Sequence, residues 1–272
     1  MSRGAVALIG DPVAHSVSPR MHQAAFDHCG FEVDYVALRV RRDEVETVFD
    51  DLRGRFVGLN VTRPLKEAVI PLVDRVGPKA AAARSVNTVV FGAETYGHST
   101  DGTGFLRALA AADVDPAGRG ALVLGTGGAA RAVVAALVEQ GAAVSVWGRN
   151  GQAASTVAAE LGAAFTPADR LAEALSGCDL LVNATPVGGD GVDSPLTPDA
   201  ELRRETAVFD LVYRPRRTPL LRRAGATGCR TIQGIEMLIE QGARSFELWT
   251  ERAAPVEVMR RAAYEALEGD GG

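Results

Sequence analysis

The sequence predicts an α/β fold in two domains, each built on a mostly parallel sheet with helices on its faces. Three observations lead to this prediction. Stretches typical of strands and of helices alternate over the first hundred residues, a pattern of parallel strands joined by crossover helices. Residues 121–131 read as a buried strand that runs into a glycine turn and a helix. Two helical stretches, 235–250 and 255–267, close the chain after the last predicted strand.

The first domain is predicted from its alternating pattern. Strands are expected at 5–10, 33–40, 56–61 and 85–91, and helices at 19–29, 43–52 and from Pro64 to about Val73. Residues 97–102 are expected to form a loop, and a helix at 103–112 leads into the next domain. We therefore place the first domain boundary after residue 102.

The second domain repeats the alternation. Strands are expected at 121–124, 142–147, 179–183, 207–212 and 230–232, and helices at 131–140, 152–161, 171–175 and 219–226. The two terminal helices have no place in this sheet, so they are expected to return to the first domain. The predicted domains are residues 1–102 with 235–272, and residues 103–234.

Composition and charge narrow the classes of protein. The chain has 272 residues, 47% of them hydrophobic and 23% charged, which suits a globular protein with a sizeable core. No apolar run reaches the roughly 18 residues of a membrane helix. The apolar run from Ala5 to Ile9 is too short for a signal peptide, so we expect a cytoplasmic protein without a membrane partner.

Cysteine spacing and net charge exclude further classes. The three cysteines, Cys29, Cys178 and Cys229, are far apart and lack the spacing of a zinc site or a disulfide framework, so reduced thiols and no metal are expected. The formal net charge of −5 argues against nucleic-acid binding. Arginines gather at 203–204, 214–217 and 222–223, and we interpret this cluster as solvated loop and helix charge.

The glycine turn has the spacing of a dinucleotide fingerprint. Gly125, Gly127 and Ala130 follow the GxGxxA pattern, which serves a tight turn, close approach to a pyrophosphate, and packing of a helix on a strand. A glycine turn alone also fits a connection that binds nothing, but here a second strand completes a βαβ unit. That strand is followed by Arg149 and no carboxylate, which favours the 2′-phosphate of NADP(H) over the free ribose of NAD(H).

Polar side chains follow the first and third strands. Ser16 and Ser18 precede a helix, and since capping needs only one serine, a polar ligand contact is predicted. Asn60 and Thr62 alternate out of the end of the third strand on one side, and Lys66 follows it; an amide, a hydroxyl and an ammonium suit a polyhydroxylated acid.

Four more residues have both a structural and a functional interpretation. Asn87 lies in a strand, where it could be a buried structural amide, and Asp101 precedes a helix, where it could be a cap. If Lys66 and Asp101 meet, they form a proton-transfer pair beside a hydride acceptor. His15 and His22 lack a partner at catalytic spacing, so we interpret them as satisfied structural histidines.

Seven motifs occur in a characteristic order. They are Ser16-Val-Ser18-Pro, Asn60-Val-Thr62-x-Pro-x-Lys66, Val86-Asn87-Thr88, Thr100-Asp101-Gly102, the glycine turn, Asn183-Ala184-Thr185 and Met237-Leu-x-x-Gln241. In order and approximate spacing the chain resembles the shikimate dehydrogenase family, from residue 5 to about residue 260. The resemblance implies a substrate domain and a Rossmann-type domain with a cleft between them. It also implies the reversible reduction of 3-dehydroshikimate to shikimate with NADPH, on the route to chorismate and the aromatic amino acids.

The resemblance also implies roles for residues. Ser16 and Ser18 would bind the substrate carboxylate, and Lys66 and Asp101 would be the catalytic pair, with Lys66 handling the proton on the reacting oxygen. Contacts to the ring hydroxyls would come from Asn60, Lys66, Asn87, Asp101 and Gln241, with Thr62 lining the same pocket. The implied cofactor residues are Gly125, Thr126, Gly127, Gly128, Ala129, Ala130, Arg149, Asn183, Ala184, Thr185, Leu211, Tyr213 and Gly234.

The chain departs from the family pattern at four positions. Arg63 replaces a usual aliphatic residue, and Ser99 replaces a usual Asn before the Thr-Asp-Gly motif. Ala153 stands where NADP-specific members often carry a second Arg, so we expect a lower preference for NADP. Thr126 replaces a common Ala within the glycine turn, a change that the turn should tolerate.

Two alternatives stay open beside the shikimate dehydrogenase hypothesis. The first is a quinate/shikimate dehydrogenase, because Arg63 and Ser99 leave substrate fit undecided. The second is an inactive ligand-sensing homologue, which should have lost Lys66, Asp101 or the glycine turn, yet all three are present. Either a monomer or a homodimer is compatible with the sequence.

Overall fold

The chain forms two compact units in a computed structural model that describes residues 4–269. Unit 1 comprises Met1–Gly104 and Ile239–Gly272, and unit 2 comprises Phe105–Leu238. The predicted internal boundaries, after residues 102 and 234, lie near these limits, whereas the predicted ends at residues 1 and 272 lie outside the described residues.

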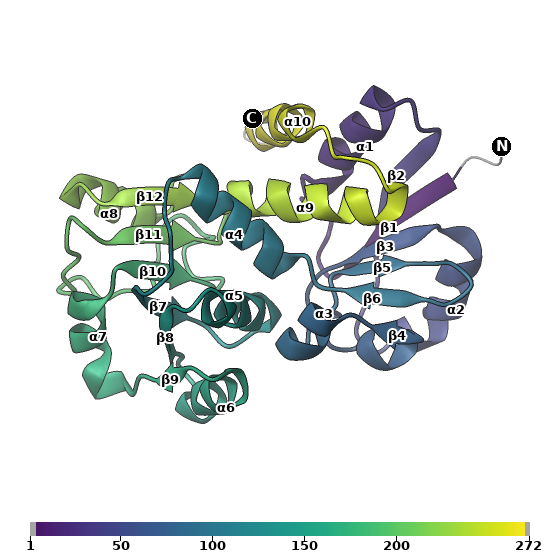
Figure 1. The fold of residues 1–272 in the computed structure, drawn as a ribbon. Coiled ribbons are helices and arrows are strands. Elements are labelled where there is room, and N and C mark those ends of the chain that lie inside the picture. Colours follow the sequence, from purple (N-terminus) through teal and green to yellow (C-terminus); the bar gives the residue numbers. More distant parts are fainter. Residues whose placement is uncertain (1–3, 270–272) are drawn as a thin grey trace. The chain divides into compact units, whose positions relative to one another are not determined.

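Unit 1 contains a six-stranded mixed sheet in the order β2-β1-β3-β5-β6-β4 (Figure 1). Its strands are β1 (Gly4–Gly10), β2 (Val33–Arg39), β3 (Gly58–Val61), β4 (Arg75–Val76), β5 (Thr88–Val90) and β6 (Tyr96–His98). β1 pairs in parallel with β2 and β3, and β4 pairs in parallel with β6, while β5 runs antiparallel to both β3 and β6. The carboxyl ends of β1 and β3 therefore lie at the same edge of the sheet.

Helices cover this sheet. They are α1 (Ser18–His28), α2 (Val45–Arg55), the 3₁₀ helix η1 (Ile70–Leu72), α3 (Pro78–Ala83) and α10 (Val256–Gly269). α4 (Asp101–Ala111) begins in unit 1, and the residues of α9 (Gly234–Thr250) from Ile239 onward belong to it. α10 packs beside α1, the first helix of the chain (Figure 1). The core under α2 is apolar, with Ile9, Phe49 and Leu59 almost fully buried.

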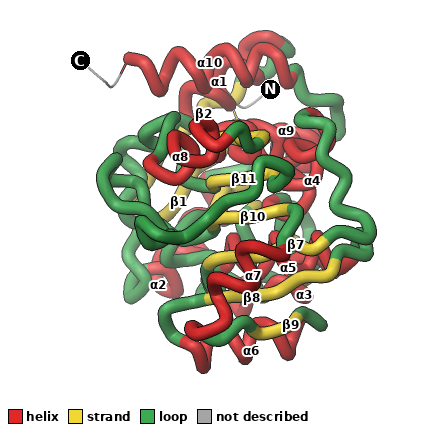
Figure 2. Tube along the Cα trace, turned by 90° about the vertical axis from the view of Figure 1, so that its left-hand side faces the viewer, coloured by secondary structure: helices red, strands yellow, loops and turns green. Residues whose placement is uncertain are grey.

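Unit 2 contains a six-stranded, entirely parallel sheet in the order β12-β11-β10-β7-β8-β9. Its strands are β7 (Gly120–Leu124), β8 (Ala143–Trp147), β9 (Ala164–Phe165), β10 (Leu180–Asn183), β11 (Ala207–Asp210) and β12 (Arg230–Gln233). Its helices are α5 (Gly128–Glu139), α6 (Gly151–Leu161), η2 (Ala168–Arg170), α7 (Leu171–Gly177) and α8 (Pro219–Thr227). Figure 2 shows β11, β10, β7, β8 and β9 stacked in that order. This strand order is that of a dinucleotide-binding doubly wound sheet, with its switch point between β7 and β10.

Two predicted elements of unit 1 are wrong. The expected helix from Pro64 to Val73 is a series of turns that ends in η1, because Pro71 has no N–H to continue an α-helix. The expected loop at 97–102 contains the end of β6 and the start of α4. β4 and β9, with two residues each, and α3, with six, are too short to show a hydrophobic period and were not predicted.

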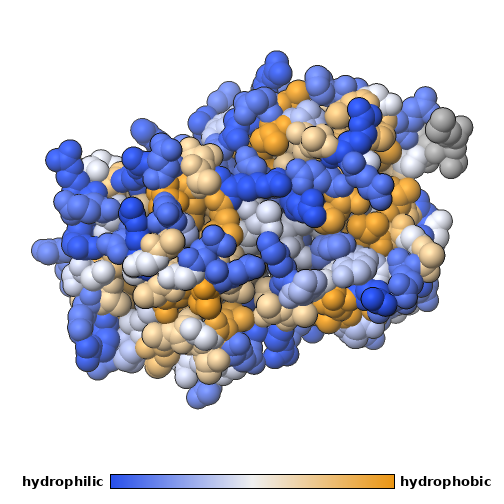
Figure 3. All heavy atoms as spheres, viewed as in Figure 1, coloured by the Kyte–Doolittle hydropathy of each residue, from blue (hydrophilic) through white to orange (hydrophobic). Residues whose placement is uncertain are grey.

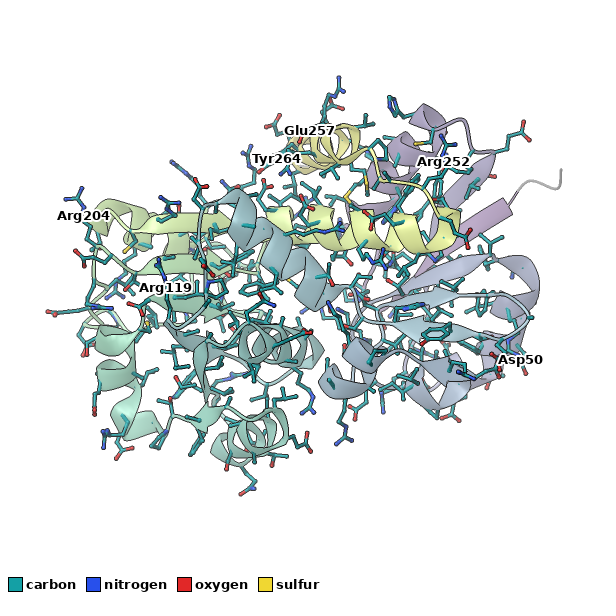
Figure 4. All side chains as sticks on the ribbon, viewed as in Figure 1. Asp50, Arg119, Arg204, Arg252, Glu257 and Tyr264 are labelled. Carbon is teal, nitrogen blue, oxygen red and sulfur yellow. The ribbon has the colours of Figure 1, made fainter. Side chains whose placement is uncertain are left out.

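The three cysteines are unpaired, and the interpretation of the arginine cluster as solvated charge is partly correct. Cys29, Cys178 and Cys229 are free thiols. Arg204 is exposed and its side chain extends outward, as does that of Glu257 (Figure 4). Arg203 instead donates to the Cys178 carbonyl at 2.8 Å, so one residue of this cluster links two segments of unit 2 by a hydrogen bond.

The visible surface mixes hydrophilic and hydrophobic residues over both units (Figure 3). Within residues 4–269, no helix is long and apolar enough to cross a bilayer. The same residues contain no cluster of His, Cys, Asp and Glu that could hold a metal ion.

Candidate functional site

Lys66 and Asp101 meet in unit 1. Lys66 lies in the turns after β3, and Asp101 is the first residue of α4. The ammonium Nζ of Lys66 donates to Oδ2 of Asp101 at 2.5 Å, and the two side chains are 19% and 5% exposed. The partial exposure of the lysine leaves its ammonium accessible, while its buried partner fixes its direction. The pair predicted conditionally from the sequence is therefore formed.

Asn87 connects this ion pair to Thr100, the residue before Asp101, and to Gln241 on α9. Its Nδ2 donates to Asp101 Oδ1 at 2.8 Å, to Thr100 Oγ1 at 2.8 Å and to Gln241 Oε1 at 3.1 Å. Its Oδ1 accepts the backbone N–H of Thr100 at 2.8 Å. Asn87 is 2% exposed and Gln241, on α9, is 9% exposed. The Asn87 amide therefore holds one oxygen of the Asp101 carboxylate, and Lys66 holds the other.

Asn60 forms a second, fully paired amide cluster. Its Oδ1 accepts the hydroxyl of Tyr35 at 2.7 Å, and its Nδ2 donates to the Asn87 carbonyl and to the hydroxyls of Thr88 and Ser245 at 3.1–3.3 Å. Burial raises the pKa of Tyr35, which keeps its hydroxyl a donor. Asn60 was predicted to contact ring hydroxyls, yet its amide already has internal partners, so its arrangement also suits support of β3 and β5.

The remaining predicted polar groups lie near the ends of β1 and β3. Ser16 is half-buried, and its Oγ accepts the backbone N–H of Ser18 at 3.2 Å. Thr62 is half-buried directly after β3. A Cβ at Gly10 would clash with Thr62 Cγ2 and would lie 2.9 Å from the Arg63 carbonyl, so a glycine is needed for the two strand ends to approach this closely.

His22 is structural but not satisfied. Neither ring nitrogen has a hydrogen-bond partner among the described residues, and the ring is fully buried, stacked on Tyr35 at 4.6 Å. Burial lowers the pKa of His22 to about 3, so the ring is neutral and packs as an aromatic side chain. His15, by contrast, is exposed.

The glycine turn of unit 2 has open backbone at the start of α5. Gly125 has φ +125°, and a Cβ there would lie 2.9 Å from the Ala184 carbonyl. Gly127 precedes α5, and a Cβ built there would meet nothing within 4 Å. Ala130 is fully buried in the core, as expected for the small residue that packs the helix on the strand. Of the other turn residues, Thr126, Gly128 and Ala129 are half-buried.

Arg149 is an exposed cation at the end of β8. It forms no hydrogen bond or ion pair with any residue in the described range 4–269. Asn150 caps α6, and its Oδ1 accepts the N–H of Ala153 at 3.1 Å. The structure therefore leaves Arg149 available to an anion while Asn150 serves the helix.

Asp210 organises the segment that follows β10. Its Oδ1 accepts from Asn183 Nδ2 at 2.8 Å, and its Oδ2 accepts from Thr218 Oγ1 at 2.6 Å. Asn183 Oδ1 in turn accepts from the hydroxyl of Thr185 at 2.6 Å and from its N–H at 3.1 Å. Asn183 is fully buried, whereas Ala184 and Thr185 are half-buried. Asn183 therefore shapes the turn that presents its two neighbours.

The last predicted cofactor residues follow β11 and β12. Leu211 and Tyr213 are half-buried, and the N–H of Leu211 donates to the Asn183 carbonyl at 2.9 Å. Gly234 is buried at the start of α9, where a Cβ would clash with the Leu211 carbonyl oxygen. The side chain of any other residue would push these two segments apart.

Unit 2 fits a phosphorylated dinucleotide. The open face at Gly127 lets a pyrophosphate approach the first turn of α5, whose N–H groups have no intrahelical partners. Arg149 supplies a free guanidinium for a 2′-phosphate.

Family models match three parts of the chain. Residues 8–89 match the shikimate dehydrogenase substrate binding domain, residues 108–209 match shikimate/quinate 5-dehydrogenase, and residues 234–264 match the shikimate 5′-dehydrogenase C-terminal domain. A shikimate dehydrogenase (NADP⁺) of Moorella thermoacetica is 43% identical over all of this chain and 96% of its own length. The chain belongs to the shikimate dehydrogenase family.

Solved structures of the family agree in fold. The shikimate 5-dehydrogenase of Thermus thermophilus, solved with NADP(H) and shikimate, is 42% identical, with a TM-score of 0.91 over 97% of this chain and 100% of that one. A quinate dehydrogenase of Corynebacterium glutamicum, solved with NAD, is 29% identical, with a TM-score of 0.83 over 96% of this chain and 99% of that one.

Several residues of these clusters were not predicted as site residues. They are Tyr35, Thr88, Thr100, Asp210, Thr218 and Ser245. Asp210 had a usable indication, since it is the one charge within an otherwise apolar predicted strand at 207–212. Thr88 and Thr100 lie within two of the seven motifs. Tyr35 and Ser245 had no indication, because their partner Asn60 lies far away in the chain.

Proposed function

We propose that the protein catalyses the reversible reduction of 3-dehydroshikimate to shikimate with NADPH, on the route to chorismate and the aromatic amino acids. The Lys66–Asp101 pair, held by Asn87, is the observation that carries the proposal, because it supplies a proton donor of fixed direction. Family membership at 43% identity over the whole chain supports the substrate and the cofactor.

The polar groups of unit 1 suit shikimate, a carboxylic acid with several hydroxyls. We assign Ser16 and Ser18 to the carboxylate, and Thr62 and Gln241 to the pocket that receives the ring. We assign Asn87 and Asp101 to the ring hydroxyls beside Lys66, where the Asp101 carboxylate accepts hydrogen bonds. Asn60 supports β3 and β5 next to these residues and does not contact the ring directly, since its amide is paired with Tyr35, Thr88 and Ser245.

Lys66 handles the proton. In the reduction direction, its ammonium donates a proton to the carbonyl oxygen of the substrate, and in the oxidation direction Lys66 takes the proton back from the hydroxyl. Asp101 holds Nζ in place and stabilises its positive charge. NADPH, when bound, supplies the hydride that this proton transfer accompanies.

The cofactor residues lie in unit 2. The residues from Gly125 to Ala130 would hold the pyrophosphate, and Arg149 the 2′-phosphate. Asn183, Ala184, Thr185, Leu211, Tyr213 and Gly234 would border the nicotinamide half. Since Asn183 and Gly234 are buried, we assign them to shaping the segments beside them rather than to direct contact.

Quinate is the second candidate substrate. The family model matched by residues 108–209 covers both shikimate and quinate enzymes, and a quinate dehydrogenase shares the fold. Arg63, which departs from the family pattern, is exposed beside Thr62.

Turnover assays distinguish these functions. kcat/KM is measured for shikimate and for quinate, each with NADP⁺ and with NAD⁺. The proposal predicts the highest value for shikimate with NADP⁺. A higher value for quinate would favour the second candidate, and no turnover of either acid would support a ligand-sensing role instead.

A cytoplasmic location and a monomeric or homodimeric state stay predictions. The oligomeric state is testable by light scattering.

A further inference from the structure

Unit 1 contains a pocket that none of the predicted substrate residues lines. Its volume is about 210 Å³. The lining residues come from α3, the β6–α4 connection and α9, and are Gly77, Pro78, Lys79, Ala80, His98, Ser99, Thr100, Thr103, Arg244 and Leu248. Two of these residues, Ser99 and Thr100, directly precede the catalytic Asp101 in the chain. The proposed reaction assigns no ligand to this pocket.

The charge of the lining is positive. Lys79 and Arg244 contribute cations, and no Asp or Glu lines the pocket. Glu247 pairs with one side of Arg244, with 3.0 Å between Nη1 and Oε2. A guanidinium has five N–H donors, so this single bond leaves donors of Arg244 for a ligand. The Asp101 carboxylate is engaged by Lys66 and Asn87.

Hydroxyl groups complete the lining. Ser99 is 7% exposed, and its Oγ has no hydrogen-bond partner among residues 4–269. A buried hydroxyl without a partner costs free energy, which a ligand that accepts its proton would recover. Thr103 Oγ1 accepts from Lys79 Nζ at 3.2 Å, so its own O–H is left to donate. Two cations and two hydroxyl donors thus surround a small space without an acceptor of opposite charge.

We propose that this pocket binds a small tetrahedral oxyanion, a phosphate group, held by Arg244, Lys79, Ser99 and Thr103. A guanidinium and an ammonium recognise phosphate through charge-assisted hydrogen bonds, and the volume admits the group with a short substituent. Ser99, which departs from the family pattern, is thereby given a role. The inference does not depend on the substrate assigned above.

A phosphate bound in this pocket is linked to the Lys66–Asp101 pair through the main chain of Thr100. Thr100 lines the pocket, and its N–H donates to the same Asn87 amide that holds Asp101. The pocket is therefore placed to make the position of Asp101 sensitive to its occupant.

Calorimetric titration tests the site. Inorganic phosphate is added to the full chain saturated with shikimate and NADPH, which occupy other anion-binding positions. One phosphate site is expected, with the dissociation constant raised at least about tenfold in Arg244→Ala, a loss of roughly 1.4 kcal/mol of binding free energy. Arg244→Lys, which keeps the charge, should recover part of the affinity, so that a folding defect is separated from a lost contact.

Arg170→Ala is the matched control. Like Arg244, Arg170 pairs with a glutamate three residues later, Glu173, but it lies outside the pocket. Its removal should leave the affinity for phosphate unchanged. Equal affinity in the wild type and Arg244→Ala, or no binding to the wild type, overturns the proposal.

His98 gives an independent readout. Burial, with a smaller effect of Arg244, lowers the pKa of His98, which stacks on Tyr96 at 4.4 Å. A phosphate beside this ring favours its protonated form, so added phosphate should raise the pKa of His98 measured by NMR in the wild type and not in Arg244→Ala.

Titration with glycerol phosphate identifies the kind of phosphate that the pocket binds. Tighter binding than that of inorganic phosphate indicates a phosphomonoester, and equal binding indicates the free ion.

Discussion

Asp210 is a carboxyl group without exposed surface, surrounded by hydrogen-bond donors from Asn183, Thr218 and the N–H of Val212. Burial outweighs these donors and raises the pKa of Asp210 to about 6. The folded protein therefore holds this proton at a pH where the unfolded chain, with an ordinary aspartate, has lost it.

This shift predicts a pH dependence of stability. Between about pH 4 and pH 6 the folded state binds more protons at Asp210 than the unfolded state, so the contribution of this residue to the free energy of unfolding falls as the pH rises. A shift of about two pKa units corresponds to a loss of up to about 3 kcal/mol over this range. Urea unfolding at several pH values measures it.

Asp210→Asn is the comparison for this prediction, because an amide does not titrate. The variant should be less stable by about 1–3 kcal/mol, since its NH₂ cannot accept from the surrounding donors. The difference in stability between the wild type and the variant should shrink as the pH rises from 4 to 6. A difference independent of pH in this range would show that Asp210 keeps an ordinary pKa.

Substitution of Ala153 is expected to increase the preference for NADPH over NADH. Its N–H is bonded to the Asn150 cap, and its side chain is half-buried on the first turn of α6. Ala153→Arg keeps the capped N–H and adds a guanidinium near Arg149. The preference for NADPH over NADH, as a ratio of kcat/KM values, should rise about tenfold, equivalent to roughly 1.4 kcal/mol.

Ala159→Arg is the control for charge alone, since Ala159 is exposed farther along the same helix. It should change the ratio little. An equal rise in both variants would mean that added charge, and not a contact to the 2′-phosphate, sets the preference.

Lys66, Asp101 and Asn87 were singled out because each lies in a short motif, after a strand, before a helix and within a strand respectively, and their roles were implied by the family resemblance. The same reasoning could not show that Asn60 pairs with Tyr35 and Ser245, since those partners come from distant segments. It also could not show that His22 packs in the core without hydrogen-bond partners among the described residues.

The crossing of α4 and α9 within unit 1 depends on a glycine. A Cβ at Gly104 would lie 2.5 Å from the backbone nitrogen of Gln241, closer than real Cβ atoms come. This approach lets Gln241 reach Asn87 and Thr100. Gly104→Ala should therefore destabilise the fold by about 1–3 kcal/mol and raise the KM for shikimate, as measured by urea unfolding and steady-state kinetics.

Gly54→Ala provides the control in another helix, α2. Gly54 is exposed, and a Cβ there would meet nothing within 4 Å. Alanine should stabilise this helix by roughly 0.5–1 kcal/mol and leave the KM unchanged. If Gly104→Ala behaved in the same way, the close crossing would not be needed for the position of Gln241.

Elements of ten or more residues were predictable, because an amphipathic helix shows its period over several turns. α1, α5, α6 and α9 were expected within a few residues of their observed bounds. The short β4, β9 and α3 were not, since two to six residues carry no period and depend on their neighbours.

At the scale of the whole molecule, the alternation of strands and helices predicted two α/β units, and the glycine turn predicted which of them has a parallel dinucleotide-type sheet. The mixed pairing of β3, β5 and β6 in unit 1 was not predictable, because strand direction depends on connections whose path the sequence does not specify. In the proposed function, the polar cluster of unit 1 serves the substrate and the open turn of unit 2 serves the cofactor.

The catalytic role of the Lys66–Asp101 pair is tested most directly by the kcat for oxidation of shikimate with NADP⁺ in Lys66→Ala and Asp101→Asn, with the exposed neighbour Glu67→Gln as control. Proton transfer by a positioned group is worth about 10²- to 10⁴-fold in rate. Both site variants should lose activity within this range while they still bind the cofactor, and the control should match the wild type. Near-full rates in both site variants would contradict the mechanism.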